Sequence, residues 1–215
     1  MGGSQLVRVL TLTLSMAVLA ACTTTENSSG SISARLRDSY IPLYKSSFLT
    51  NHYAGALVVA PYVAVTNDHN ANLIPENIIL AHSREYDLLF FRTDHQMVPP
   101  IGSLYVGQDV IAYGQNGRTH LNEAKGVVRS LDTYLPERCP ECRVQRAMAY
   151  DAEGGEGFSG GPVVDAASGA LLGITFGFEN GKAEGGGRRM YAYDMDLVMS
   201  EMYRLLDNPS ATPRD

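Results

Sequence analysis

Most of the chain between residues 54 and 194 consists of short apolar runs separated by turn-forming residues. The runs are rich in Val, Ile, Leu, Phe, Tyr and Ala, and Gly, Pro, Asn or Asp punctuates most of the gaps, as is typical of β-strands. The pattern predicts strands at Ala54–Ala60, Tyr62–Thr66, Asn77–Ala81, Leu88–Arg92, Asp109–Tyr113, Gly126–Ser130, Val144–Tyr150, Gly161–Val164, Ala170–Phe176 and Arg189–Asp194. Many short strands without intervening helices indicate an all-β barrel or sandwich rather than a parallel sheet.

The pattern changes toward both ends of the chain. From Asp196 to Leu206 apolar residues recur at helical spacing, which predicts one C-terminal amphipathic α-helix that stops before Asn208-Pro209. At the start, Arg8 precedes an apolar run from Val9 to Val18 that is too short to span a bilayer as a mature helix. A charged start, a short apolar run and small residues after it indicate an export signal.

The end of this signal carries the sequence Leu19-Ala20-Ala21-Cys22. It resembles the bacterial lipoprotein lipobox, which implies a signal peptide at 1–21 and membrane attachment through a lipidated Cys22. An ordinary signal peptide or an uncleaved anchor is the alternative. By the same resemblance, Thr23 favours the outer membrane, facing the periplasm. We expect residues 22–37 to form a flexible tether and residues 208–215 to form a disordered tail.

Composition narrows the classes of partner and cofactor. The 215 residues suffice for one double-barrel domain, and a net charge of −6 without a Lys/Arg-rich run argues against nucleic acid. We expect no cofactor and no metal, because the single Cys139-Pro140-Glu141-Cys142 motif has no second ligand pair nearby. Cys139 and Cys142 instead predict a small structural disulfide in a loop, consistent with export. The oligomeric state is open.

Ser159 lies in the glycine-rich segment Gly155-Glu156-Gly157-Phe158-Ser159-Gly160-Gly161. Glycines on both sides leave the hydroxyl uncrowded and let a substrate carbonyl approach backbone N–H groups. A tight turn between strands is the alternative interpretation. A nucleophilic serine also needs a base, and His69 follows a strong β segment at the position where a loop can present its ring.

Three segments together resemble a known family. Gly157-Phe158-Ser159-Gly160-Gly161-Pro162, Val65-Thr66-Asn67-Asp68-His69 and Asp87-Leu88-Leu89-Phe90-Phe91 are similar to the nucleophile, histidine and aspartate segments of trypsin-like serine proteases, in the same order. The resemblance implies a chymotrypsin-like double six-stranded β-barrel over residues 38–207 that hydrolyses peptide bonds in proteins or peptides.

The resemblance also implies the roles of individual residues. Ser159 is the nucleophile, His69 the base and Asp87 the residue that orients the ring, and the N–H groups of Gly157 and Ser159 form the oxyanion hole. Thr175-Phe176-Gly177 is the strand edge that pairs with the substrate backbone. The bacterial HtrA (Deg) branch is the most similar, and no PDZ domain is expected after the terminal helix.

Two departures from the family pattern leave alternatives open. Phe158 replaces the usual Asp or Asn before the serine, so a different contact must hold the oxyanion loop. The interval from His69 to Asp87 is short, which leaves Asp94 and Asp68 as substitutes for the third residue of the triad. These departures motivate a rival hypothesis, a catalytically inactive envelope lipoprotein that uses the scaffold as a binding module. Esterase activity by the same triad is a second rival.

The residue preference at the cleavage site is open as well. Glu153, six residues before the nucleophile, lies by resemblance near the base of the primary pocket, where a carboxylate could pair with Lys or Arg of a substrate. If the loop follows the HtrA pattern instead, small aliphatic residues are preferred and Glu153 points into solvent.

Overall fold

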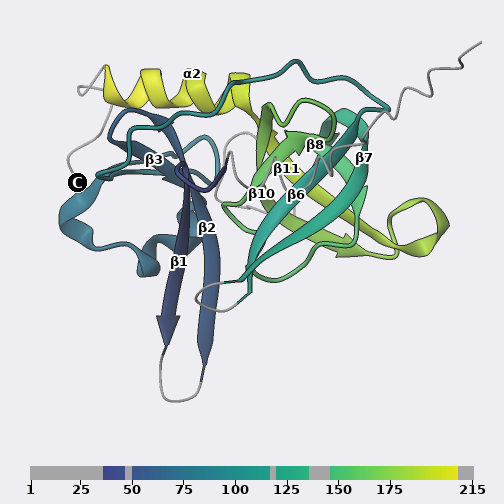
Figure 1. Cartoon of the computed structure of the whole chain (residues 1–215), viewed down its shortest axis with the longest axis horizontal. Helices are drawn as coiled ribbons and strands as arrows, with labels where there is room; N and C mark the ends of the chain where they lie inside the picture. The colour runs from purple at the N-terminus through teal and green to yellow at the C-terminus, as the bar shows by residue number, and fades with distance from the viewer. Residues whose placement is uncertain (1–35, 47–49, 117–119, 136–145, 208–215) are drawn as a thin grey trace, which may run out of the picture.

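The chain forms two β units followed by one helix (Figure 1). The computed structural model describes residues 36–46, 50–116, 120–135 and 146–207. Within these ranges every predicted strand overlaps an observed strand, and the predicted helix corresponds to α2 (Met195–Leu206). The all-β class with a C-terminal helix is therefore confirmed.

The first unit is an antiparallel sheet in the order β1-β2-β3-β5-β4. The strands are β1 (Tyr40–Ser46), β2 (Asn51–Ala60), β3 (Val63–Thr66), β4 (Ile79–His82) and β5 (Leu89–Arg92). Two 3₁₀ segments, η1 (Asp68–Leu73) and η2 (Glu76–Ile78), connect β3 to β4. The described part of this unit thus has five strands, where the family resemblance implies six. The apolar pattern did not predict β1, because Pro42 interrupts it, and proline is tolerated here since β1 is an edge strand.

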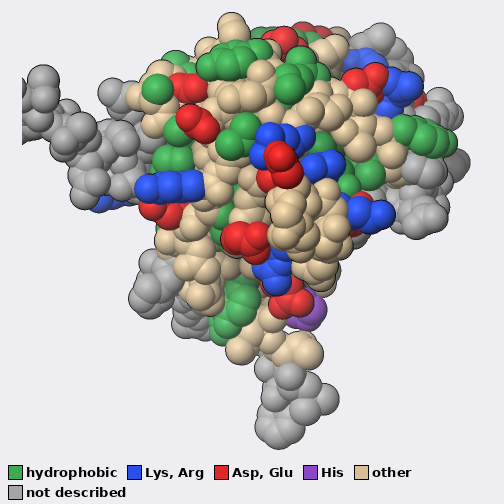
Figure 2. Space-filling view, turned by 90° about the vertical axis from the view of Figure 1, so that its right-hand side faces the viewer, with side chains coloured by type: hydrophobic (Ala, Val, Ile, Leu, Met, Phe, Trp, Pro, Cys, Tyr) green, Lys and Arg blue, Asp and Glu red, His purple; other side chains and the backbone are tan. Residues whose placement is uncertain are grey.

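The second unit is a closed barrel in the order β10-β11-β8-β7-β6-β9. Its strands are β6 (Asp109–Asn116), β7 (His120–Tyr134), β8 (Arg146–Ala152), β9 (Pro162–Asp165), β10 (Leu171–Asn180) and β11 (Arg188–Asp194), with η3 (Glu184–Gly186) between the last two. Closure pairs the strands around the barrel and leaves no free sheet edge along most of its length. Figure 2 shows basic and acidic side chains interspersed on the face that lies to the right in Figure 1. That face offers no extended basic surface to a phosphate backbone.

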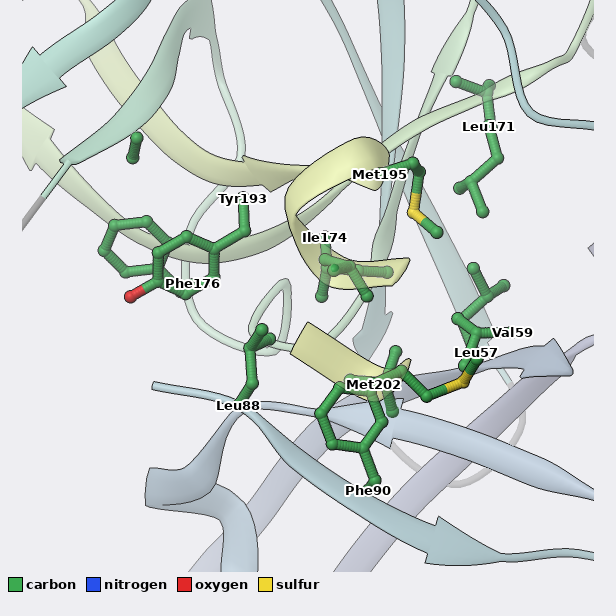
Figure 3. Packing of buried hydrophobic residues seen from close by; sticks show 14 of the residues in the cluster. Leu57, Val59, Leu88, Phe90, Leu171, Ile174, Phe176, Tyr193, Met195 and Met202 are labelled. Carbon is green, nitrogen blue, oxygen red and sulfur yellow. The ribbon is translucent and has the colours of Figure 1, made fainter. Parts of the chain in front are cut away.

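One apolar cluster joins both units and the helix. Figure 3 shows Leu57 and Phe90 of the first unit packed near Met202 of α2, and Phe176 and Tyr193 of the second unit with their rings face to face. The centroids of these two rings are 4.5 Å apart. Burial of apolar surface contributes about 25 cal/mol per Å². The shared cluster therefore stabilises the packing of the two units against each other.

Helix α2 lies against both units, and its buried face includes a charged residue. Asp194 caps its N-terminus by accepting the Leu197 N–H at 2.9 Å. Val198, Met202 and Leu205 are buried as its amphipathic pattern requires, but Glu201 is buried with them at 4% exposure. A carboxylate is rarely found there unless it is paired.

Several predictions concern residues outside the described ranges. The signal peptide, Cys22, the tail at 208–215, and the Cys139–Cys142 pair all lie there, so they remain predictions. Among the described residues, no helix has the length and apolar character needed to span a membrane. Within the same ranges, no group of three or more His, Cys, Asp and Glu side chains is arranged to hold a metal ion.

Candidate active site

The segment around Ser159 has a backbone that only glycine adopts readily. Gly157 and Gly160 have φ angles of +83° and +74°. The Phe158 N–H donates to the Gly155 carbonyl at 3.2 Å, and a positive φ at the third residue of such a turn is characteristic of type II geometry. The glycine-rich sequence is therefore required by the turn that leads into Ser159.

This segment is joined directly to the first unit. The Gly55 N–H in β2 donates to the Ser159 carbonyl at 2.8 Å. Gly160 lies so close to β2 and β3 that a Cβ there would overlap the Gly55 carbonyl oxygen and the Thr66 hydroxyl. Thr66 in turn donates to the Gly55 carbonyl at 2.7 Å. Ser159 of the second unit is thus fixed against the strand that precedes His69.

The Phe158 ring holds the loop before Ser159 by apolar packing. Its ring is 5% exposed and belongs to the core of the closed barrel. Gly114 lies directly against the ring, since a Cβ on Gly114 would overlap it, and Gly154 and Met190 lie on another side. An apolar anchor in the barrel therefore holds the loop where an ion pair would otherwise be needed.

His69 and Asp87 form a hydrogen-bonded pair on the first unit. Asp87 Oδ2 lies 2.6 Å from His69 Nδ1, and Asp87 Oδ1 accepts the His69 backbone N–H at 3.0 Å. The carboxylate binds both the ring and the main chain of one residue, which fixes the orientation of the imidazole. The side chain of His69 is 46% exposed and that of Asp87 is 12% exposed. The exposed part of the ring is consequently accessible to a ligand.

The two substitute aspartates lie elsewhere. Asp68 Oδ1 is 2.5 Å from His82 Nδ1, so it forms a second His-Asp pair beside the first. Asp94 follows β5, whereas Asp87 precedes it, and it lines an apolar cavity of about 700 Å³ with Tyr62 and Phe91. Of the three candidates, Asp87 is the one whose carboxylate contacts the His69 ring in the structure.

The pKa of His69 is raised above its ordinary value of 6.5. Burial lowers the pKa, but the hydrogen bond to Asp87 and the negative charges of Asp87 and Asp68 raise it by more. Because the folded-state pKa is raised, this pairing stabilises the fold fully below the unfolded pKa, and the contribution is lost as the pH rises through the folded pKa.

Main-chain contacts on both sides hold Asp87 in place. The Asn67 side-chain amide donates to the Asp87 carbonyl at 3.1 Å, and the Asp87 N–H donates to the Tyr193 hydroxyl at 3.2 Å. Asn67 is fully buried and Tyr193 is 2% exposed. The Tyr193 contact could not be predicted from the sequence, because Tyr193 is 106 positions from Asp87 and the contact depends on how the two units pack.

The three residues expected to pair with a substrate, Thr175-Phe176-Gly177, differ in their contacts. The Thr175 N–H donates to the Gly161 carbonyl at 2.9 Å, and the Thr175 carbonyl accepts the Gly160 N–H at 2.8 Å. The Thr175 main chain is therefore occupied by the segment that follows Ser159. Phe176 is buried against Tyr193, and the pairing of β10 with β11 shifts register between Thr175 and Gly177. Any edge open to a peptide therefore begins beyond Thr175.

Glu153 and Gly154 contact two residues of β11, Arg188 and Met190. Glu153 is exposed, and its carboxylate accepts the Arg188 N–H at 3.3 Å. The Arg188 guanidinium donates to the Gly154 carbonyl at 2.6 Å and lies 5.1 Å from the ring centre of Phe178. Met190 lies against Gly154 and is fully buried. An apolar side chain, rather than the Glu153 carboxylate, thus fills the space behind this loop.

Comparisons with known proteins identify the family and the fold of the chain. The family profile described as a trypsin-like peptidase domain matches residues 43–174. A solved structure of the HtrA-type protease AlgW with a tripeptide superposes with a TM-score of 0.67 at 18% identity, over 84% of this chain and 64% of that chain. The active form of the Rv3671c protease from M. tuberculosis superposes with a TM-score of 0.61 at 16% identity, over 80% and 82% of the two chains. At such identities the structural likeness concerns the fold, and a search of curated protein sequences found no match.

Replacing Phe158 by Ala should destabilise the protein by about 3–5 kcal/mol, because it removes a buried ring and leaves a cavity. Urea unfolding of the two proteins measures the difference. Leu131→Ala is the control, because Leu131 is 43% exposed. A loss for Phe158→Ala no larger than that for Leu131→Ala would show that the ring does not anchor the loop.

Replacing Asp68 by Asn should lower the pKa of His69, because it removes a negative charge that favours the protonated ring. The titration of His69 by NMR measures this pKa directly. Asp94→Asn, on the far side of β5, should leave it unchanged. An unchanged His69 titration in Asp68→Asn would contradict the assigned electrostatic effect.

Proposed function

The chain belongs to the trypsin-like peptidase family, and on that premise we propose that it is a serine endopeptidase acting through Ser159, His69 and Asp87. The observation that carries the proposal is the joint placement of these groups. Asp87 fixes the His69 ring at 2.6 Å, and the Ser159 backbone is bonded to the same sheet through Gly55 at 2.8 Å. These two contacts, one within the first unit and one between the units, support the assignment of His69 as base and Ser159 as nucleophile.

The proposed reaction is acyl transfer to serine followed by hydrolysis. Ser159 Oγ attacks the peptide carbonyl while His69 Nε2 takes its proton, and His69 then returns a proton to the leaving amine. Water attacks the acyl-enzyme by the reverse sequence. Asp87 keeps the ring in one tautomer and stabilises the cation, which agrees with the raised pKa of His69.

The N–H groups of Gly157 and Ser159 stabilise the oxyanion in this proposal. The type II turn at Gly155–Phe158 and the apolar anchor at Phe158 support it, since both fix the backbone before substrate binds. Loss of one such donor costs about 3–4 kcal/mol in transition-state stabilisation. Fixed backbone donors act without reorganisation when charge develops.

We place the substrate peptide along β10 beyond Thr175, in the neighbourhood of Gly177. A Cβ on Gly177 would meet no atom within 4 Å, so the surface there is open to a ligand. The buried Met190 behind Gly154 supports a preference for small aliphatic residues at the cleavage site. The exposed position of Glu153 gives less support to a pocket for Lys or Arg.

Two departures from the family pattern, Phe158 before the serine and the short interval from His69 to Asp87, motivated the hypothesis of an inactive binding module. Phe158 holds the nucleophile loop by packing, and Asp87 reaches His69 although the two are only 18 positions apart. Neither departure therefore argues against catalysis. Esterase activity by the same residues would differ only in the leaving group.

We also propose that the protein is a lipoprotein of the bacterial cell envelope, attached through Cys22 and facing the periplasm from the outer membrane. The lipobox-like sequence Leu19-Ala20-Ala21-Cys22 after a short apolar run supports this. The substrates of such an enzyme are proteins or peptides of the envelope.

Replacing either Ser159 or His69 by Ala should remove nearly all peptide hydrolysis, and the double mutant should lose little more, because the two act as a unit. Asp87→Asn should lower kcat by up to about 10⁴-fold through the wrong tautomer. Cleavage of an unfolded protein, followed by mass spectrometry, measures these rates, with Asp94→Asn as the matched control. Normal cleavage by Asp87→Asn together with its loss in Asp94→Asn would reassign the third residue.

Metabolic labelling with a palmitate analogue should mark the wild-type protein, and Cys22→Ser should abolish the label because the acylated thiol is absent. Fractionation of the same cells should place only the wild type in the outer membrane. A soluble and unlabelled wild-type protein would refute the lipoprotein proposal without affecting the catalytic one.

A further inference from the structure

Glu201 is a buried carboxylate on α2 that the proposed chemistry does not use. It is 4% exposed, and Arg204 donates to its two oxygens from Nε at 2.7 Å and Nη2 at 2.6 Å. Its third contact comes from the Ser83 hydroxyl, which donates to Oε1. A buried charge of this kind is tolerated only when it is fully paired, so this contact is a specific feature of the fold.

Ser83 uses the whole hydrogen-bonding capacity of its hydroxyl. The oxygen accepts the N–H groups of Glu85 at 3.1 Å and Tyr86 at 3.0 Å, which directs its single proton toward Glu201. The Ser83 N–H also donates to the Leu88 carbonyl at 2.9 Å, which closes the turn. The conformation of the turn at 83–88 is therefore fixed around one hydroxyl group.

This turn carries Asp87. The residue follows Tyr86 directly, and its own N–H donates to the Tyr193 hydroxyl at 3.2 Å. The rings of Tyr86 and Tyr193 also meet edge to face, with their centres 5.5 Å apart. The turn belongs to the first unit, but it is also bonded to α2 through Glu201 and to β11 through Tyr193.

We propose that Ser83 and Glu201 are positioning residues that hold the Asp87 carboxylate against His69. The inference rests on the proposed function, since it assigns these residues a part in the same site. Neither side chain contacts the His69 ring or Ser159 in the described structure, so they act through the backbone of the turn.

Ser83→Ala in the full-length protein tests the proposal. Displacement of Asp87 should lower kcat by on the order of 10- to 100-fold, with KM little changed because the substrate is not contacted. Glu201→Gln keeps the shape of the side chain, and it should act in the same direction. The double mutant should be no slower than the slower single mutant, because both residues belong to one chain of contacts.

Ser168 offers a matched control. Its hydroxyl likewise donates to a carboxylate, Asp165 at 2.6 Å, and accepts a backbone N–H, that of Ala170 at 3.2 Å. It lies in the turn between β9 and β10, away from Asp87. Ser168→Ala should therefore leave kcat unchanged, and thermal unfolding of all the variants shows whether a loss of activity is merely a loss of folded protein.

The NMR titration of His69 separates this inference from the proposed function. Loosening Asp87 should move the His69 pKa downward in Ser83→Ala and not in Ser168→Ala, whether or not the protein cleaves peptides. Asp68 and its partner His82 also lie near His69, so the titration of His82 is followed in the same spectra. The proposal is overturned if Ser83→Ala and Glu201→Gln lower the thermal midpoint but leave both kcat and the His69 pKa at their wild-type values. If the wild type is inactive but the His69 pKa falls as expected, the positioning role stands and the proposed function fails.

Discussion

The site depends on the close approach of the Ser159–Gly160 backbone to β2 and β3. The Gly55 N–H donates to the Ser159 carbonyl. A side chain on Gly160 would overlap the Gly55 carbonyl and the Thr66 hydroxyl, so only glycine allows this approach. Thr66 is three positions before His69, so this contact links the segment of the proposed nucleophile to the segment of its proposed base. The shared apolar cluster between the units supplies the driving force, but the glycine allows the contact to form.

A second constraint acts on Asp87 from the other end of the chain. The turn that carries it receives hydrogen bonds or packing from Asn67, Tyr193 and the Ser83–Glu201 contact. Helix α2 thus packs on the apolar cluster and also contacts this turn, since its buried Glu201 accepts a hydrogen bond from Ser83. The proposed catalytic pair on the first unit and the proposed oxyanion turn on the second unit are each held by hydrogen bonds within the protein.

The sequence predicted the strands because alternating apolar runs and turn residues are local properties, and it indicated Ser159, His69 and Asp87 because their motifs are local too. It missed β1, where the position at a sheet edge makes Pro42 acceptable. It showed that Phe158 cannot form an ion pair but not that Gly114 would make room for the ring. Ser83 and Glu201 are 118 positions apart, and no local pattern connects them.

The proposed reaction requires that Ser159 is a nucleophile activated by His69. The most direct measurement is labelling of the purified protein with a fluorophosphonate probe, followed by mass spectrometry to locate the modified residue. We expect one adduct, on Ser159, formed rapidly in the wild type and at most slowly in His69→Ala. Absence of labelling in folded wild-type protein, or an adduct on another serine, would contradict it.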